Sequence, residues 1–187
     1  MEIVAGKARG IQLRSPVNDE VRPTSIRARK AFFDSMGDLD GLVFADLCAG
    51  SGAMGLEAAS RGAAKVHFLE KSKSSSKVIQ QNCNIIARAG VNTEFELIPC
   101  ELPVLPGKVR LLAKPDIVFA DPPYAISMEI LKGITASPVF LEWAGNAVMY
   151  WELPDSGYRL EPPQSPWKIT EIKTLGSTRF LVLRCVN

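Results

Sequence analysis

The stretch that decides the fold is residues 42–55, Leu-Val-Phe-Ala-Asp-Leu-Cys-Ala-Gly-Ser-Gly-Ala-Met-Gly. Its first six residues form an apolar run of the length of a buried strand, and a G-x-G-x-x-G sequence follows at Gly50, Gly52 and Gly55. Glycines between a strand and a helix let the backbone turn sharply and approach a ligand closely. The stretch therefore predicts a strand, a glycine-rich loop and a helix, in that order.

Short apolar runs continue to alternate with helical segments on the C-terminal side of this stretch. They predict strands at residues 42–47, 65–70, 94–98, 116–120 and 147–152, and helices at residues 55–60, 74–89 and 128–135. Two further apolar-rich runs, residues 168–175 and 178–186, flank a short turn at Gly176-Ser177 and predict an antiparallel hairpin. We therefore expect an α/β fold with a mostly parallel seven-stranded sheet that ends in a C-terminal hairpin.

The N-terminal side of the stretch predicts a short basic extension followed by a helix. Thr24 or Ser25 can cap this helix, which should run to about Met36 and stop at Gly37. The first thirty residues carry seven basic and three acidic side chains, a balance of +4, which leaves −2 for the rest of the chain. We expect residues 1–37 to pack on a core formed by residues 38–187, as one compact domain.

Four residues of this basic region are candidates for contacts with the phosphates of a nucleic acid: Arg22, Thr24, Arg27 and Arg29. A solvated, charged helix surface is an equally good explanation for them, because such surfaces are common. The sequence alone leaves both interpretations open.

Composition excludes several other classes of protein. With 187 residues, of which 47% are hydrophobic, the chain is long enough for one sizeable core. Its four cysteines are widely separated and form no C-x-x-C pair, so we expect neither a disulfide framework nor a metal site. No apolar run has the length of a membrane span or a signal peptide, and we expect a cytoplasmic protein with no membrane partner.

Two acids mark the ends of the first two predicted strands, where α/β folds bind ligands. Asp46 stands four residues before Gly50, where a carboxylate would repel a diphosphate but could accept a hydrogen bond from a cationic amino-acid group. Glu70 can accept both ribose hydroxyls of an adenosine, a geometry that dinucleotide sites share. Because S-adenosyl-L-methionine has a cationic amino-acid group, Asp46 favours it over a nicotinamide or flavin dinucleotide, whereas Glu70 does not discriminate between them.

The tetrapeptide Asp121-Pro122-Pro123-Tyr124 directly follows the strand predicted at residues 116–120. An exocyclic amine on a nucleic-acid base is a poor nucleophile, so a catalyst must hold acceptors against its N–H protons. The Asp121 carboxylate and the Pro122 carbonyl can be those acceptors, and the two prolines restrict the backbone that carries them. Tyr124 offers a ring face on which an extruded base can stack. The tetrapeptide indicates methylation of a base amino group.

The chain resembles the bacterial 16S ribosomal RNA guanine-N2 methyltransferases of the RsmD type. The resemblance extends over nearly the whole chain, through Val4-Ala-Gly-Lys-Ala-Arg-Gly10, Arg22-Pro-Thr24, Asp46-Leu-Cys-Ala-Gly-Ser-Gly-Ala-Met-Gly55, Asp121-Pro-Pro-Tyr124 and Lys173-Thr-Leu-Gly-Ser-Thr178. It implies a Rossmann-like fold and methyl transfer from S-adenosyl-L-methionine to N2 of one guanine, in 16S rRNA presented by the small ribosomal subunit. No obligate protein partner is implied.

The resemblance also implies roles for individual residues. It implies cofactor binding for Asp46, Gly50, Gly52 and Glu70, and catalysis for the tetrapeptide, in which we expect Asp121, Pro122 and Tyr124 to be catalytic. We also expect Ala49 to contact the cofactor and Arg22, Thr24, Arg27 and Pro123 to bind the substrate. The family usually has an aspartate after the third strand, which contacts the adenine amino group. This chain has Cys100-Glu101 there, and we expect Glu101 to take that place.

Four alternative functions stay open at this point. A DNA adenine-N6 or cytosine-N4 methyltransferase would use the same tetrapeptide, but this chain has no room for a large target-recognition region. A protein-glutamine methyltransferase would have asparagine at the position of Asp121. From other classes come a dinucleotide-dependent oxidoreductase with a prolyl turn and a non-catalytic RNA-binding assembly factor.

Overall fold

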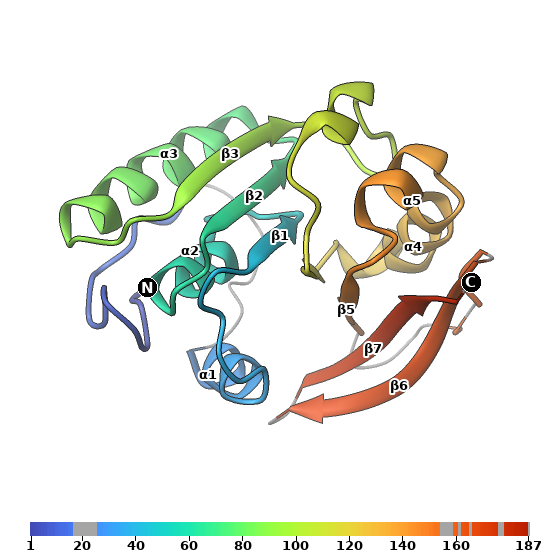
Figure 1. Cartoon of the computed structure of the whole chain (residues 1–187), viewed down its shortest axis with the longest axis horizontal. Coiled ribbons are helices and arrows are strands. Elements are labelled where there is room, and N and C mark those ends of the chain that lie inside the picture. The colour runs from blue at the N-terminus through green and yellow to red at the C-terminus, as the bar shows by residue number, and fades with distance from the viewer. Residues whose placement is uncertain (17–25, 154–158, 161, 165, 176–177, 187) are drawn as a thin grey trace.

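A seven-stranded sheet forms the centre of the protein. The computed structural model describes residues 1–16, 26–153, 159–160, 162–164, 166–175 and 178–186. The strands lie side by side in the order β3-β2-β1-β4-β5-β7-β6, and only β7 and β6 pair antiparallel to their neighbours (Figure 1). Their bounds are β1 Val43–Leu47, β2 Lys65–Glu70, β3 Glu94–Pro99, β4 Ile117–Ala120, β5 Val148–Glu152, β6 Trp167–Leu175 and β7 Thr178–Cys185. The predicted mostly parallel sheet with a C-terminal hairpin is confirmed, and each strand end lies within one residue of its prediction; the turn at residues 176–177 lies outside the described residues.

Five α-helices and two short 3₁₀ helices join these strands in the part of the chain that the structure describes. Their bounds are α1 Ile26–Asp34, α2 Ala53–Ser60, α3 Lys73–Arg88, η1 Gly107–Leu111, η2 Tyr124–Ile126, α4 Ser127–Thr135 and α5 Pro138–Ala144. Helix α5 was not predicted, although Ser137 caps it by accepting a hydrogen bond from the Phe140 N–H, and Pro138 occupies its first turn. The predicted caps of the first helix, Thr24 and Ser25, lie outside the described residues.

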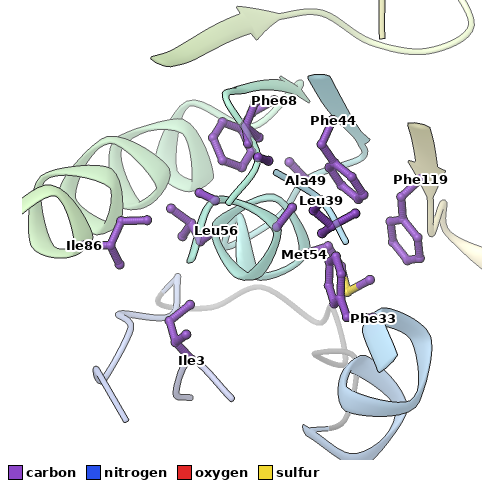
Figure 2. Close-up of a cluster of buried hydrophobic side chains, with 14 of the residues drawn as sticks. Ile3, Phe33, Leu39, Phe44, Ala49, Met54, Leu56, Phe68, Ile86 and Phe119 are labelled. Atoms are coloured by element: carbon purple, nitrogen blue, oxygen red, sulfur yellow. The ribbon is translucent and has the colours of Figure 1, made fainter. Parts of the chain in front are cut away.

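Two apolar clusters cover the two faces of the sheet. Along β4, Ile117 and Phe119 belong to one cluster, whereas Val118 and Ala120 belong to the other, as the two-residue period of a strand requires. The first cluster joins the sheet to α1, α2, α3 and the N-terminal segment (Figure 2). The second joins it to α4, α5 and η1. Burial on both faces explains why β1 and β4, at the centre of the sheet, are almost entirely apolar.

The N-terminal segment, residues 1–16, docks on α2 through a buried carboxylate. Glu57 accepts hydrogen bonds from the backbone N–H groups of Val4 and Ala5, at 2.8 and 3.0 Å. It also lies 3.5 Å from Nε of Arg29, and both side chains are fully buried. Arg29 is therefore neither a phosphate contact nor part of a solvated helix surface, the two interpretations that the sequence left open. The sequence pattern does not reveal that Glu57 lies beside it.

Within the described residues, no helix combines the length and the apolar character that crossing a membrane requires.

The third glycine of the loop, Gly55, lies where α2 packs against β2. A Cβ atom added there would approach Phe68 to 2.4 Å and Val66 to 2.7 Å, closer than real Cβ atoms come. We expect Gly55→Ala to lower the free energy of unfolding by about 1–3 kcal/mol, because the core must shift to admit the methyl group. Urea unfolding measures the change. Gly107→Ala is the matched control: its added Cβ meets no atom within 4 Å, so an equal loss there would contradict the packing argument.

The Glu57 carboxylate should be essential for stability. Glu57→Ala leaves Arg29 buried without its carboxylate partner, and we expect the free energy of unfolding to fall by roughly 3–5 kcal/mol. The comparison is Glu94→Ala, which removes an exposed ion pair with Lys65 and should cost less than about 1 kcal/mol. Thermal or urea denaturation of the two variants tests the difference, and equal losses would show that the buried pair has no special role.

Candidate functional site

A cavity of about 530 Å³ opens at the carboxyl ends of β1, β2 and β4. Its wall contains Gly50 and Glu70 from the first half of the chain, Glu101 after β3, and the tetrapeptide from Asp121 to Tyr124 after β4. Because β1 pairs with both β2 and β4 in parallel, these three strand ends meet at one edge of the sheet. The fold thus brings together the two motifs that the sequence places about seventy residues apart.

Glu70 holds the glycine loop against the end of β2. Its Oε2 accepts a hydrogen bond from the Gly50 N–H at 2.7 Å, and its Oε1 accepts one from the Ser72 N–H at 2.7 Å. Gly50 has a φ of +55°, and a Cβ atom built on it would meet nothing within 4 Å. The loop backbone is therefore uncovered on its cavity side, and each Glu70 oxygen retains a lone pair for a further donor.

Asp46 lies under the glycine loop and is only 2% exposed. It is not among the residues that line the cavity. Its Oδ2 accepts a hydrogen bond from the Gly55 N–H at 2.9 Å, which ties the end of β1 to the first turn of α2. Burial raises the pKa of Asp46 well above its usual range, and the nearby Glu70 and Asp121 carboxylates raise it further, against the lowering effect of the Gly55 N–H.

Ala49 and Gly52 are the buried residues of the glycine-rich loop. Gly52 takes a left-handed conformation at the N-terminus of α2. Neither lines the cavity. They shape the loop instead of offering side-chain contacts to a ligand.

Two thiols line the cavity beside these acids. Burial raises the pKa of Cys48 to about 12, and the Glu70, Asp46 and Asp121 carboxylates contribute to the shift. Burial likewise raises the pKa of Cys100 to about 11, with a further contribution from Glu70. Both groups are protonated at neutral pH, so the cavity contains no reactive thiolate from them.

The tetrapeptide follows β4 and leads directly into η2. Asp121 is half-buried, Pro122 is buried, and the Tyr124 ring is 53% exposed at the cavity wall. Immediately after η2, the Ser127 hydroxyl accepts a hydrogen bond from the indole N–H of Trp151 at 2.9 Å. Because Trp151 belongs to β5, this bond fixes the far end of the tetrapeptide loop to the sheet.

Glu101 reaches the cavity from the segment after β3. Its carboxylate lies 3.1 Å from the Lys71 ammonium, and both side chains are largely exposed. Glu101 lies in the cavity wall, its expected role toward adenine stays a prediction, and its ion pair with Lys71 was not foreseen. Lys71 and Glu101 lie in two loops that are 30 residues apart in the sequence, so no local sequence pattern predicts their ion pair.

The remaining predicted substrate-binding residues lie elsewhere or outside the described chain. Arg27 is exposed on α1 and does not line the cavity, whereas Arg22 and Thr24 lie outside the described residues. Sequence reasoning also missed Ser72, Leu102 and Ile130, which line the cavity. Of these three, only Ser72 could have been found from the sequence, because it closely follows the strand that ends in Glu70 and is placed to cap α3. In the described part of the chain, no group of three histidine, cysteine or acidic side chains could hold a metal ion.

Comparison with known proteins places this site in a family. The family model "Conserved hypothetical protein 95" matches residues 1–184. The chain is 27% identical to "Ribosomal RNA small subunit methyltransferase D" of Haemophilus influenzae, over 96% of this chain and 91% of that protein.

Solved structures show the same fold over the full length. A hypothetical protein of Thermus thermophilus is 28% identical, with a TM-score of 0.73 over 100% of this chain and 99% of the other. A putative methylase of Haemophilus influenzae is 25% identical, with a TM-score of 0.66 over 100% and 98% of the two chains. These matches confirm the Rossmann-like fold and the resemblance drawn from the sequence. The chain therefore belongs to the family described as Conserved hypothetical protein 95 and is a methyltransferase of the RsmD type.

Proposed function

We propose that the protein transfers a methyl group from S-adenosyl-L-methionine to the exocyclic N2 of a guanine in 16S rRNA, presented by the small ribosomal subunit. The observation that carries this proposal is the shared cavity, in which Gly50 and Glu70 lie in one wall with Asp121 and Tyr124. The name of the Haemophilus influenzae relative, a methyltransferase of the small-subunit ribosomal RNA, supports the class of substrate.

The residues of the cavity fit the methyl donor. Its volume of about 530 Å³ lies in the range of small-molecule sites. Glu70 has lone pairs for the two ribose hydroxyls, and the uncovered backbone at Gly50 admits close approach. Glu70, Asp121 and the buried Asp46 make the site acidic, which favours a cationic ligand. When bound, the sulfonium of this cofactor supplies an electrophilic methyl group.

Glu101 completes the proposed cofactor site at the rim. Its carboxylate can accept a hydrogen bond from an exocyclic amine such as that of adenine, because it keeps lone pairs beyond its contact with Lys71. Asp46 acts from beneath, by fixing the loop through Gly55 and by its charge, since it does not line the cavity.

The tetrapeptide acts on the target base. The Asp121 carboxylate and the Pro122 carbonyl accept hydrogen bonds from the two N–H groups of the amine, which favours a nitrogen with an available lone pair. Pro122 and Pro123 contribute no N–H of their own that would compete for these acceptors. The exposed Tyr124 ring stacks on the extruded base, and the proton released on methylation goes to Asp121 or to solvent.

We expect methyl transfer to depend on Asp121. Small-subunit particles from cells that lack this methyltransferase, with labelled S-adenosyl-L-methionine, should yield N2-methylguanosine on nucleoside analysis. Asp121→Ala should lower kcat by a factor of about 10² or more, because an acceptor for the amine is lost, while the Kd of the cofactor by calorimetry changes less than threefold.

The same assay separates the rival activities. Label in methylated adenine or cytosine of DNA would keep the fold and overturn the substrate. A wild-type protein that binds S-adenosyl-L-methionine but labels no substrate would favour the non-catalytic RNA-binding protein. Tighter binding of a nicotinamide dinucleotide than of S-adenosyl-L-methionine would favour the oxidoreductase.

Asp46→Asn should make the ligand-free protein more stable but weaken its binding of the cofactor. Burial raises the folded-state pKa of Asp46, so ionisation costs stability as the pH rises from its ordinary value of 3.8 through the raised value. Asparagine carries no charge and keeps an oxygen for the Gly55 N–H, so the ligand-free variant should be more stable by roughly 0.5–2 kcal/mol above that window and equal to wild type below it.

The same change should weaken cofactor binding, because a negative charge near the cation is lost. We expect the Kd of S-adenosyl-L-methionine to rise about tenfold at pH values above the raised pKa, and the affinity of the wild type, but not of the variant, to increase with pH through the window. Urea unfolding and calorimetry at several pH values measure both quantities. A variant that is less stable than wild type above that window would contradict this role of Asp46.

A further inference from the structure

We propose that the phosphate backbone of the RNA substrate binds a surface made of α3 and the N-terminal segment, beside the mouth of the cavity. Six cations define this surface, here called the basic face: Lys7, Arg9, Arg14, Lys73, Lys77 and Arg88. The inference rests on the proposed function only in that RNA is the substrate, and it locates the binding surface on a helix that none of the sequence motifs includes.

Helix α3 presents its cations on one side. Lys73, Lys77 and Arg88 are exposed and recur at helical spacing, and no acidic residue occurs between Lys73 and Arg88. The buried residues of the helix are Ser75, Ile79, Asn82 and Ile86, which at 3.6 residues per turn project from the opposite side. The charged side is therefore free of the packing that orients the helix on the sheet.

The N-terminal segment packs along α3: its backbone meets the buried side of the helix at Asn82, and the Arg14 side chain contacts the exposed Gln81. Residues 3–16 contain no acidic residue, and Lys7, Arg9 and Arg14 are all exposed. Asn82 accepts a hydrogen bond from the Arg14 N–H at 2.8 Å and donates one to the Arg14 carbonyl at 3.0 Å. The guanidinium of Arg14 donates to the Gln81 side chain at 2.9 Å. Two segments that lie 68 residues apart in the sequence thus form one surface (Figure 1).

The basic face begins at the cofactor site. Ser72 and Ser75, at the start of α3, line the cavity next to Lys73. Asn82 also donates a hydrogen bond to the Ser51 carbonyl of the glycine loop at 3.1 Å. An RNA strand on the basic face would therefore run up to the cavity that holds Asp121 and Tyr124.

Within the described residues, the six cations have no carboxylate partner, as is also true of Lys108, Lys114 and Lys168; the six differ from these in lying together on α3 and the N-terminal segment. By contrast, Lys30, Lys65, Lys71 and Arg110 each form an ion pair with a carboxylate. Exposed cations without internal counter-charges repel one another and attract a polyanion, and the phosphates of RNA have the matching charge.

The test replaces the three cations of α3 by alanine, which retains helix propensity. For Lys73→Ala/Lys77→Ala/Arg88→Ala we expect the KM for small-subunit particles to rise at least tenfold, with kcat and the Kd of S-adenosyl-L-methionine within twofold of wild type. In filter binding to 16S rRNA, the slope of log affinity against log salt concentration should fall by about 2–3, near one for each phosphate that the variant no longer neutralises.

The matched control is Lys108→Ala/Lys114→Ala/Lys168→Ala, which removes the same charge from exposed positions outside the basic face. It should keep the wild-type KM and salt slope; an equal effect in both triple variants, or none in the α3 variant, overturns the proposal. Loss of binding to particles with unchanged binding to free 16S rRNA also overturns it, in favour of an acidic protein partner. RNA binding is measured without methyl transfer, so a failed methylation assay counts against the proposed function alone.

Discussion

The carboxylate of Glu70 holds together the parts on which the rest of the site depends. A parallel sheet ends in loops whose backbone N–H groups have no partners in the strands, and such groups must be satisfied when they are buried. Glu70 accepts two of them, from Gly50 in the glycine loop and from Ser72 at the start of α3. One side chain thereby fixes the glycine-rich loop and the start of α3, both of which line the cavity, relative to each other.

Charge placement gives the site its chemical character. Asp46, Glu70 and Asp121 come from three strand ends and lie close enough that the other two negative charges raise the pKa of Asp46. Such an arrangement is unfavourable in an empty cavity and becomes favourable when a cation arrives. Under the proposed function, the ligand-free protein is thus less stable than it could be, and the same charges favour a cationic cofactor, a trade that functional sites commonly show.

The sequence predicts the centre of the sheet well because both faces of β1 and β4 are buried. Its parallel strands read as short apolar runs bounded by polar residues, and the hairpin strands are equally distinct. Helix α5 is only seven residues long and follows α4 after a short break, so its apolar period is too brief to recognise.

The site residues that could be predicted from the sequence are those at the ends of predicted strands, such as Glu70 and Asp121. Contacts between distant segments could not be predicted: nothing near Arg29 in the sequence indicates Glu57, and nothing near Glu101 indicates Lys71. The roles of the individual site residues stay predictions.

The docking of the N-terminal segment has a consequence for the order in which the chain folds during synthesis. Val4 and Ala5 bond to Glu57, and Arg14 bonds to Asn82, across separations of 53, 52 and 68 residues. Translation proceeds at roughly 5–20 residues per second, so the first residues wait several seconds for these partners to emerge from the ribosome. Residues 4–14 are therefore made before their partners and are fully fixed only after α3 is complete, and until then the cations among them stay exposed beside the ribosome that is producing the chain.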